Sequence, residues 1–145
     1  MIGDDNIFLI DTNILVYAYA EKHEQKSAAA LELLKKCWKN KAVYSISSQN
    51  LAEFSFIATK KYKINSDTIK EILSDIMEFN GFVKINYSEK TVVNALNLAK
   101  EFNIPFWDSL LIATMKENKI FNIYTENTDD FKVPWINAVS PFGKV

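Results

Sequence analysis

The chain has 145 residues, 48% of them hydrophobic, and a formal net charge of −1. This length suits one domain with its own core, and the composition excludes disordered and disulfide-rich proteins. Cys37 is the only cysteine, so no disulfide can form within the chain and a reducing compartment is expected. We therefore expect a single cytoplasmic domain over residues 1–145, in which Cys37 is a buried, inert thiol.

The first twenty residues are apolar and end in Ala18-Tyr19-Ala20, which resembles a signal-peptidase site. However, Asp4 and Asp5 stand where a signal peptide needs positive charge, and Asp11 interrupts the apolar run. No stretch approaches the roughly 18 apolar residues of a membrane span. The sequence therefore predicts neither a signal peptide nor a membrane helix.

The first half of the chain predicts two strands, each followed by helices. Residues 7–10 (IFLI) form a continuous apolar run, which is typical of a buried parallel strand. The capping residues Asp11-Thr12-Asn13 end this strand, and a helix begins there. A second helix, residues 25–38, places apolar side chains on one face at Ala28, Leu31, Leu34 and Trp38. A second strand at residues 43–46 leads into a helix that runs to about residue 62, with apolar Leu51, Phe54, Ile57 and Ala58 at helical spacing.

The second half continues the alternation. A helix that opens at Asn65-Ser66-Asp67 is expected to end near Asn80-Gly81, before a third strand at residues 82–86. Ser88 caps the next helix, whose apolar residues are Val92, Ala95, Leu96 and Ala99. Pro105 separates it from a further helix, and strands are predicted at residues 121–125 and 136–139. This order favours an α/β fold with a largely parallel sheet. The sequence has no glycine-rich phosphate loop, which excludes dinucleotide-binding and P-loop proteins.

Acidic residues follow the predicted strands. Asp11 follows the first strand, Glu53 lies in the helix after the second, and Asp108 begins the helix before the fourth. The fourth strand is followed by Glu126, Asn127, Asp129 and Asp130. Ligands of open α/β sheets bind beyond the carboxyl ends of the strands. Clustered carboxylates repel one another, and a divalent cation removes that penalty.

Oxygen ligands without Cys or His favour Mg²⁺ or Mn²⁺ over Zn²⁺. A metal ion held in this way can assist hydrolysis of a phosphodiester. Each acid also has a simpler interpretation, because Asp11 and Asp108 can serve only as helix caps and Glu53 as an exposed helical residue.

Several segments of the sequence resemble the PIN-domain family, and in particular the small toxin nucleases of VapBC-type toxin–antitoxin pairs. They are FLIDTNILVYA, SSQNLAEF, IPFWDSLLIATMKEN and IYTENTDDF, and the closing INAVSPF resembles the family's last strand and tail. The resemblance implies a three-layer α/β/α sandwich with a mostly parallel sheet of four or five strands. It also implies an Mg²⁺-dependent endoribonuclease that has an RNA substrate and a small antitoxin partner and is commonly a homodimer.

The same resemblance suggests which residues form the site. The first three acids of the family match Asp11, Glu53 and Asp108. Where many members have a fourth acid, this chain has Asn127, so Asp130 is the preferred substitute and Glu126 the alternative. Two polar residues of the family also have counterparts, at Asn13 and Thr125. The expected metal ligands are thus Asp11, Glu53, Asp108 and Asp130, assisted by Asn13 and Thr125.

Other functions remain open. A haloacid-dehalogenase-like phosphohydrolase also begins with an Asp after its first strand, but its second Asp is replaced here by Asn13. A degenerate PIN module would bind RNA or protein without cutting. A stand-alone PIN nuclease in RNA processing would have no antitoxin. The net charge decides little, because an acidic site offsets a basic surface in the sum.

Phe54 and Phe56 lie two residues apart in a predicted helix, so both cannot face the same core. One is expected to point outwards, where a second copy of the chain or an apolar antitoxin helix would cover it. Aromatic residues make up 13% of the chain, which also favours an interface. His23 and the lysine-rich residues 35–41 are expected to be solvated.

Overall fold

The computed structural model describes residues 7–143. Residues 1–6 and 144–145 of the expected single domain, and with them Asp4 and Asp5, lie outside this range. Along the described chain the elements are β1 (Phe8–Ile10), α1 (Thr12–Tyr19), α2 (Glu24–Trp38), β2 (Tyr44–Ser47), α3 (Ser48–Lys60), α4 (Ser66–Glu78), β3 (Phe82–Ile85), α5 (Glu89–Phe102), α6 (Phe106–Glu117), β4 (Asn122–Tyr124), the short 3₁₀ helix η2 (Thr128–Phe131) and β5 (Asn137–Val139).

The five strands form one parallel sheet in the order β3-β2-β1-β4-β5. The central strand β1 pairs with β2 on one side and with β4 on the other, so that Leu9 lies opposite both Ser45 and Ile123. The chain builds outwards from β1 to β3 and then returns to the other side of β1. Such a reversal opens a crevice at the carboxyl ends of the strands on either side of it.

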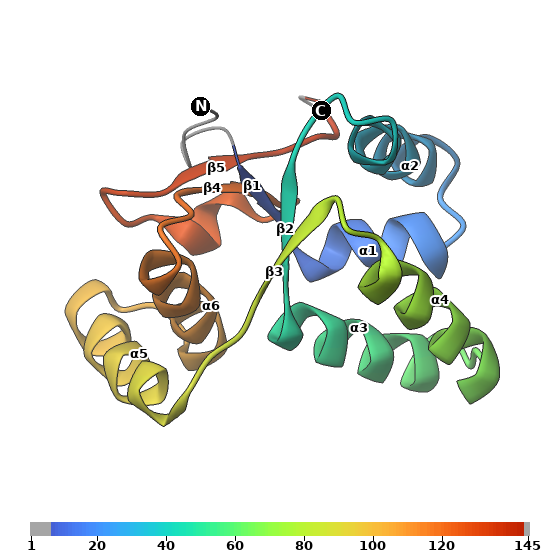
Figure 1. Cartoon of the computed structure of the whole chain (residues 1–145). Helices are drawn as coiled ribbons and strands as arrows, with labels where there is room; N and C mark the ends of the chain where they lie inside the picture. Colours follow the sequence, from blue (N-terminus) through green and yellow to red (C-terminus); the bar gives the residue numbers. More distant parts are fainter. Residues whose placement is uncertain (1–6, 144–145) are drawn as a thin grey trace.

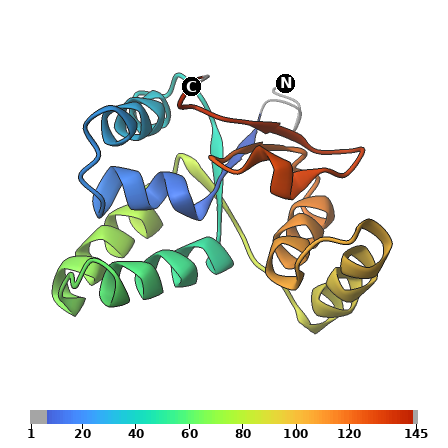
Figure 2. The ribbon, with the colours of Figure 1, turned by 180° about the vertical axis from the view of Figure 1, so that it is seen from behind.

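Helices cover both faces of the sheet, which confirms the predicted three-layer α/β/α sandwich (Figures 1 and 2). Helices α1 to α4 lie on one face, and α5, α6 and η2 lie on the other. Leu9 and Ile10 are both fully buried, yet they belong to the separate cores on the two faces. Successive strand residues point to opposite faces, which explains why β1 is continuously apolar.

Two predicted helix faces are wrong in part, although Leu34 of α2 and Ala95 of α5 are buried as predicted. In α2 the buried residues are Ala30, Leu33, Leu34 and Cys37, whereas Ala28 and Trp38 are exposed. The run AAALELL holds two overlapping apolar stripes at helical spacing, and packing selects the stripe with the small residues Ala30 and Cys37. In α5, Leu98 is buried and Leu96 is 56% exposed, because the inward stripe runs through Thr91, Ala95 and Leu98.

The predicted glycine cap of α4 is also wrong. The helix ends at Glu78, and Phe79 follows in an extended conformation. Gly81 has no positive φ, but a Cβ there would collide with the ring of Phe79. The carbonyl of Gly81 accepts a hydrogen bond from Sγ of Cys37 at 3.6 Å. Cys37 is 1% exposed, which confirms that it is buried.

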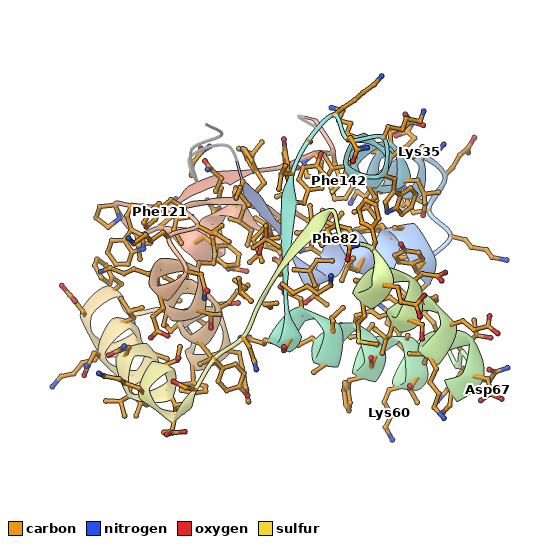
Figure 3. The ribbon with its side chains drawn as sticks, viewed as in Figure 1. Lys35, Lys60, Asp67, Phe82, Phe121 and Phe142 are labelled. Carbon is orange, nitrogen blue, oxygen red and sulfur yellow. The ribbon has the colours of Figure 1, made fainter. Side chains whose placement is uncertain are left out.

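Charged side chains lie on the outer surfaces of the helices. Figure 3 shows Lys35, Lys60 and Asp67 on α2, α3 and α4, at the outside of the molecule. His23 is exposed as expected, and its Nδ1 caps α2 by accepting a hydrogen bond from the backbone N–H of Lys26. Between residues 7 and 143 no helix is long and apolar enough to cross a membrane.

Candidate functional site

Asp11 lies at the carboxyl end of β1, where the sheet changes direction. Its backbone N–H donates to the carbonyl of Tyr124 at 3.1 Å, which fixes the end of β1 beside β4. Its Oδ1 accepts from the N–H of Thr12 at 2.8 Å and so caps α1. The capping role that the sequence left open is therefore real, but it uses one oxygen of the carboxylate.

The other oxygen of Asp11 is held by Thr125. The hydroxyl of Thr125 donates to Oδ2 of Asp11 at 2.7 Å, and Thr125 is fully buried. Nδ2 of Asn13 lies 3.4 Å from the same hydroxyl, and Oδ1 of Asn13 accepts from the N–H of Glu126 at 3.2 Å. Asn13 and Thr125 thus tie the start of α1 to the end of β4 and fix the orientation of Asp11.

Six carboxylates line one cavity of about 320 Å³ at this edge of the sheet, and four of them are the expected metal ligands. These four are Asp11 at the end of β1, Glu53 of α3, Asp108 of α6 and Asp130 of η2, and the other two are Glu21 and Glu126. Tyr17, Lys61 and Tyr62 also line the cavity. A wider hollow of about 540 Å³ is lined by residues 17–24 and Ser27 and contains none of the four carboxylates. The structure therefore brings together all four acids of the expected site.

The electrostatics of these groups reflect their proximity. Burial, together with the negative charges of Asp130 and Asp11, raises the pKa of Asp108 to about 6. Burial also raises the pKa of Asp11, against the lowering effect of its bonds to Thr125 and Thr12, and Asp130 adds to the rise. Loss of solvation raises the pKa of Glu53, as do Asp11 and Asp108, while a hydrogen bond from Gln49 opposes them. Each of the three acids is thus destabilised as an anion.

This donor set suits a hard cation. None of the ion pairs in the described chain involves these four acids. At the same time, within residues 7–143 no three acidic, histidine or cysteine side chains are arranged to hold a metal ion as they stand. Mg²⁺ commonly keeps several waters and takes only one or two carboxylates directly, so an open cluster of oxygen ligands fits Mg²⁺ better than a metal that needs a closed cage.

Glu126, the alternative fourth acid, lines the same cavity but is already paired. Its carboxylate accepts hydrogen bonds from Nζ of Lys26 at 2.5 Å and from the hydroxyl of Tyr17 at 3.0 Å. Asp130 has a different environment, because it lies in η2 and its charge acts directly on Asp11 and Asp108. The charge of Glu126 is compensated from α2, and that of Asp130 is not compensated within the cluster.

Asn50, which was not among the expected site residues, is fully buried beside Asp11. Its Nδ2 donates to the hydroxyl of Thr12 at 3.0 Å and lies 3.4 Å from Oδ1 of Asp11, while its Oδ1 accepts from the hydroxyl of Ser47. The sequence could have indicated Asn50 by its position, because it is a polar residue one turn before Glu53 in a helix that packs on the sheet. The pairing of Tyr17 and Lys26 with Glu126 left no comparable signal, because roughly a hundred residues separate the partners.

A family model described as PIN domain matches residues 8–134, which include all four carboxylates. The chain belongs to the PIN domain family. No curated protein sequence is significantly similar to it. The fold of this PIN domain is shared by solved structures of low sequence identity, so the likeness to those structures concerns the fold alone.

Three of these structures illustrate the likeness. A toxin–antitoxin complex from Klebsiella pneumoniae has a chain that is 23% identical, with a TM-score of 0.66 over 93% of this chain and 98% of that chain. The toxin VapC20 of Mycobacterium tuberculosis, described as cleaving the sarcin–ricin loop, is 16% identical, with a TM-score of 0.68 over 90% and 96%. VapBC2 of Rickettsia felis, bound to a DNA fragment from its promoter, is 21% identical, with a TM-score of 0.66 over 92% and 98%.

Proposed function

We propose that this PIN domain is a divalent-metal-dependent endoribonuclease and the toxin of a toxin–antitoxin pair. The observation that carries the proposal is the convergence of Asp11, Glu53, Asp108 and Asp130 on one cavity at the switch point of the sheet. Like charges gathered in this way favour a site that binds a cation, because the cation relieves their mutual repulsion.

Asp11, Glu53, Asp108 and Asp130 would hold Mg²⁺ or Mn²⁺, whose oxygen preference they match. When bound, the metal ion would supply Lewis-acid stabilisation of the phosphodiester and lower the pKa of a coordinated water. The neighbouring residues prepare the site for it. Thr125 and the N–H of Thr12 hold the two oxygens of Asp11, and Asn13 positions Thr125.

Asn50 supports the same carboxylate from α3. It joins Asp11, Thr12 and Ser47 in one buried group of hydrogen bonds, so β1, α1 and α3 meet at a fixed geometry. A site held in this way does not need to reorganise when charge develops in the reaction. Glu126 serves a different purpose in this proposal, because its pairing with Lys26 fixes α2 against the end of β4.

The toxin assignment rests on resemblance. One protein of similar fold is described as a toxin that cleaves the sarcin–ricin loop, and others come from toxin–antitoxin complexes. We extend this to the present chain and propose a small antitoxin as its partner and the cytoplasm as its location. A stand-alone PIN nuclease in RNA processing is the alternative, and a small reading frame beside the gene would favour the toxin.

We also propose a homodimer. Val93 and Leu96 of α5 are 57% and 56% exposed. Exposed apolar residues such as these favour association with a second copy of the chain. Phe54 is fully buried and Phe56 is 65% exposed, so one of the two phenylalanines points outwards as expected. Light scattering on the purified protein should give about twice the chain mass of 16.6 kDa.

The central test is cleavage of RNA with and without Mg²⁺, comparing the wild type with Asp11→Asn. Asp67→Asn, a substitution of the same kind on the outer side of α4, is the matched control (Figure 3). We expect metal-dependent cleavage by the wild type and the control and none by Asp11→Asn. Cleavage that is independent of metal, or that survives Asp11→Asn, contradicts the proposal. A wild type that binds Mg²⁺ weakly and never cleaves would indicate the degenerate module.

A further inference from the structure

An aromatic groove lies beside the acidic cavity. It has a volume of about 600 Å³ and is lined by Gln49, Ala52, Glu53, Phe56, Ile57, Tyr87 and Trp107. Three of these residues are aromatic and project into solvent, since Phe56 is 65% exposed, Trp107 62% and Tyr87 39%. They come from α3, α6 and the connection between β3 and α5, which meet at the carboxyl edge of the sheet (Figures 1 and 2).

The groove and the acidic cavity adjoin each other. Glu53 and Ile57 line both of them. On the side of α6, Trp107 faces the groove and the next residue, Asp108, faces the cavity. A polymer whose phosphate lies in the acidic cavity would therefore have an adjacent unit within reach of the groove.

One polar atom in the groove has no partner. Gln49 is 6% exposed, and its Nε2 donates to the backbone carbonyl of Trp107 at 2.9 Å. This bond directs the NH₂ group of the amide towards Trp107. Oε1 is left buried without a hydrogen-bond partner in the described structure, and a buried acceptor of this kind favours a ligand that brings an N–H donor.

We propose that this groove is a nucleobase-binding subsite, which takes a base next to the scissile phosphate of single-stranded RNA. The base stacks against the side chains of Phe56 and Trp107 and donates an N–H of its exocyclic amino group to Oε1 of Gln49. Single-stranded RNA is commonly bound in this way, by aromatic stacking combined with hydrogen bonds to the base edge. The proposal rests on the ribonuclease function proposed above and adds a preference for bases that carry an amino group.

The chemistry of the groove favours a base over an apolar protein surface. An apolar helix face would cover Phe56 and Trp107 but leave Oε1 of Gln49 unpaired, whereas adenine or cytosine satisfies both the rings and the acceptor. Uracil carries a carbonyl where cytosine has its amino group. Its N–H donor at N3 lies between two carbonyl oxygens, and these would approach the oxygen of Gln49 when the N–H does. With RNA in the groove, protein contacts fall on other exposed residues such as Val93 and Leu96.

The test is RNA binding by the full chain in EDTA at low salt, where binding is read without cleavage. Short single-stranded oligomers of adenosine, cytidine and uridine are titrated while tryptophan fluorescence is followed. We expect quenching that disappears in Trp107→Phe, and affinity that is higher for adenosine and cytidine than for uridine oligomers. Phe56→Ala should weaken binding at least about fivefold. Met77→Ala, which removes a side chain that is 53% exposed on α4, is the matched control and should bind as the wild type does.

Gln49→Met separates recognition of the base from a general loss of structure. It should abolish the preference for adenosine and cytidine over uridine, which mere loosening of α3 would not do. The proposal is overturned if the wild type shows no such preference or binds no oligomer. It is also overturned if Phe56→Ala converts a dimer to a monomer by light scattering without changing RNA affinity, because a second copy then covers the groove.

Failure of the subsite and failure of the ribonuclease proposal give different results. If the protein binds RNA through Phe56 and Gln49 but never cleaves it, the subsite is supported and the ribonuclease proposal is contradicted. If the protein cleaves RNA but binds it equally well without Phe56 and Gln49, the ribonuclease proposal is supported and the subsite is contradicted.

Discussion

Two groups of acidic residues lie at the same edge of the sheet, and they differ in whether a cation neutralises their charge. Asp11, Glu53, Asp108 and Asp130 line the cavity with no paired cation among them, and three of them have raised pKa values. Glu126 lines the same cavity but is paired with Lys26 and hydrogen-bonded by Tyr17. Proximity to a site therefore does not make an acid a metal ligand. An acid is available to a metal only when the protein has not already neutralised it.

The largest expected effect comes from removing a charge of the unpaired cluster. Asp108→Asn keeps the shape of the side chain but removes a charged ligand, so RNA cleavage in Mg²⁺ should fall roughly a hundredfold or more. The unfolding temperature without metal should stay level or rise slightly, because repulsion from Asp11 and Asp130 is relieved. Single-turnover cleavage and thermal unfolding measure the two effects. Undiminished cleavage by the purified variant would remove Asp108 from the site.

The next effect distinguishes the two regions directly. Asp130→Asn should reduce Mn²⁺ affinity by about tenfold or more, and Glu126→Gln should reduce it less. The reason is that Asp130 acts on Asp11 and Asp108, whereas the charge of Glu126 is offset by Lys26. Titration of Mn²⁺ by calorimetry gives both constants. A greater loss for the Glu126 variant would reverse the assignment of the fourth acid.

The sequence predicts the unpaired acids of the cavity better than it predicts the pairing of Glu126. Asp11 follows a predicted strand, and Glu53 and Asp108 lie in helices next to predicted strands. The rule that ligands bind at the carboxyl edge of a parallel sheet was therefore enough to group them. The strands themselves were predictable because an apolar run such as IFLI suits burial on both faces. The structure brings the expected residues to one cavity, while their binding of metal stays a prediction.

Features that depend on tertiary packing were not predictable in this way. The pairing of Lys26 with Glu126 joins residues that are 100 positions apart, and neither local sequence marks the contact. The position of Asp130 depends on the short helix η2. Backbone hydrogen bonds stabilise this helix, among them the one from the N–H of Asp130 to the carbonyl of Asn127. The face of α2 was predicted only in part because two apolar stripes overlap there, and packing against α1 selects between them.

A smaller effect appears in the pH dependence of stability without metal. The pKa of Asp108 is about 6 in the folded protein, against its ordinary value of 3.8. Between these values the folded state binds more protons than the unfolded state, so stability falls as pH rises from about 4 to about 6. Urea unfolding in EDTA across this range measures it. Asp108→Asn should flatten this part of the profile, whereas Glu126→Gln should leave it in place. A profile that is unchanged in Asp108→Asn would contradict the raised pKa.

The smallest expected effect comes from breaking the paired region instead of the unpaired one. Lys26→Met removes the partner of Glu126 but keeps an apolar stem that can still pack near Tyr17 and Phe142, whose rings lie 5.4 and 5.8 Å from Nζ of Lys26. The side chains of Lys26 and Glu126 are 31% and 28% exposed. Since partly exposed ion pairs contribute little to stability, the unfolding temperature should change by less than about 3 °C.

The informative result of Lys26→Met is electrostatic. Freed of Lys26, the charge of Glu126 adds to the cavity, so Mn²⁺ affinity should rise modestly instead of falling. The double variant Lys26→Met/Glu126→Gln should return it towards the wild-type value, because it removes both charges of the pair. A similar gain in the double variant would show that Lys26 repels the metal ion by itself, and the charge of Glu126 would then have no part in the site. A loss of Mn²⁺ affinity in Lys26→Met would show instead that the pair orders the cavity, and the contrast between the two acidic regions would be structural and not electrostatic.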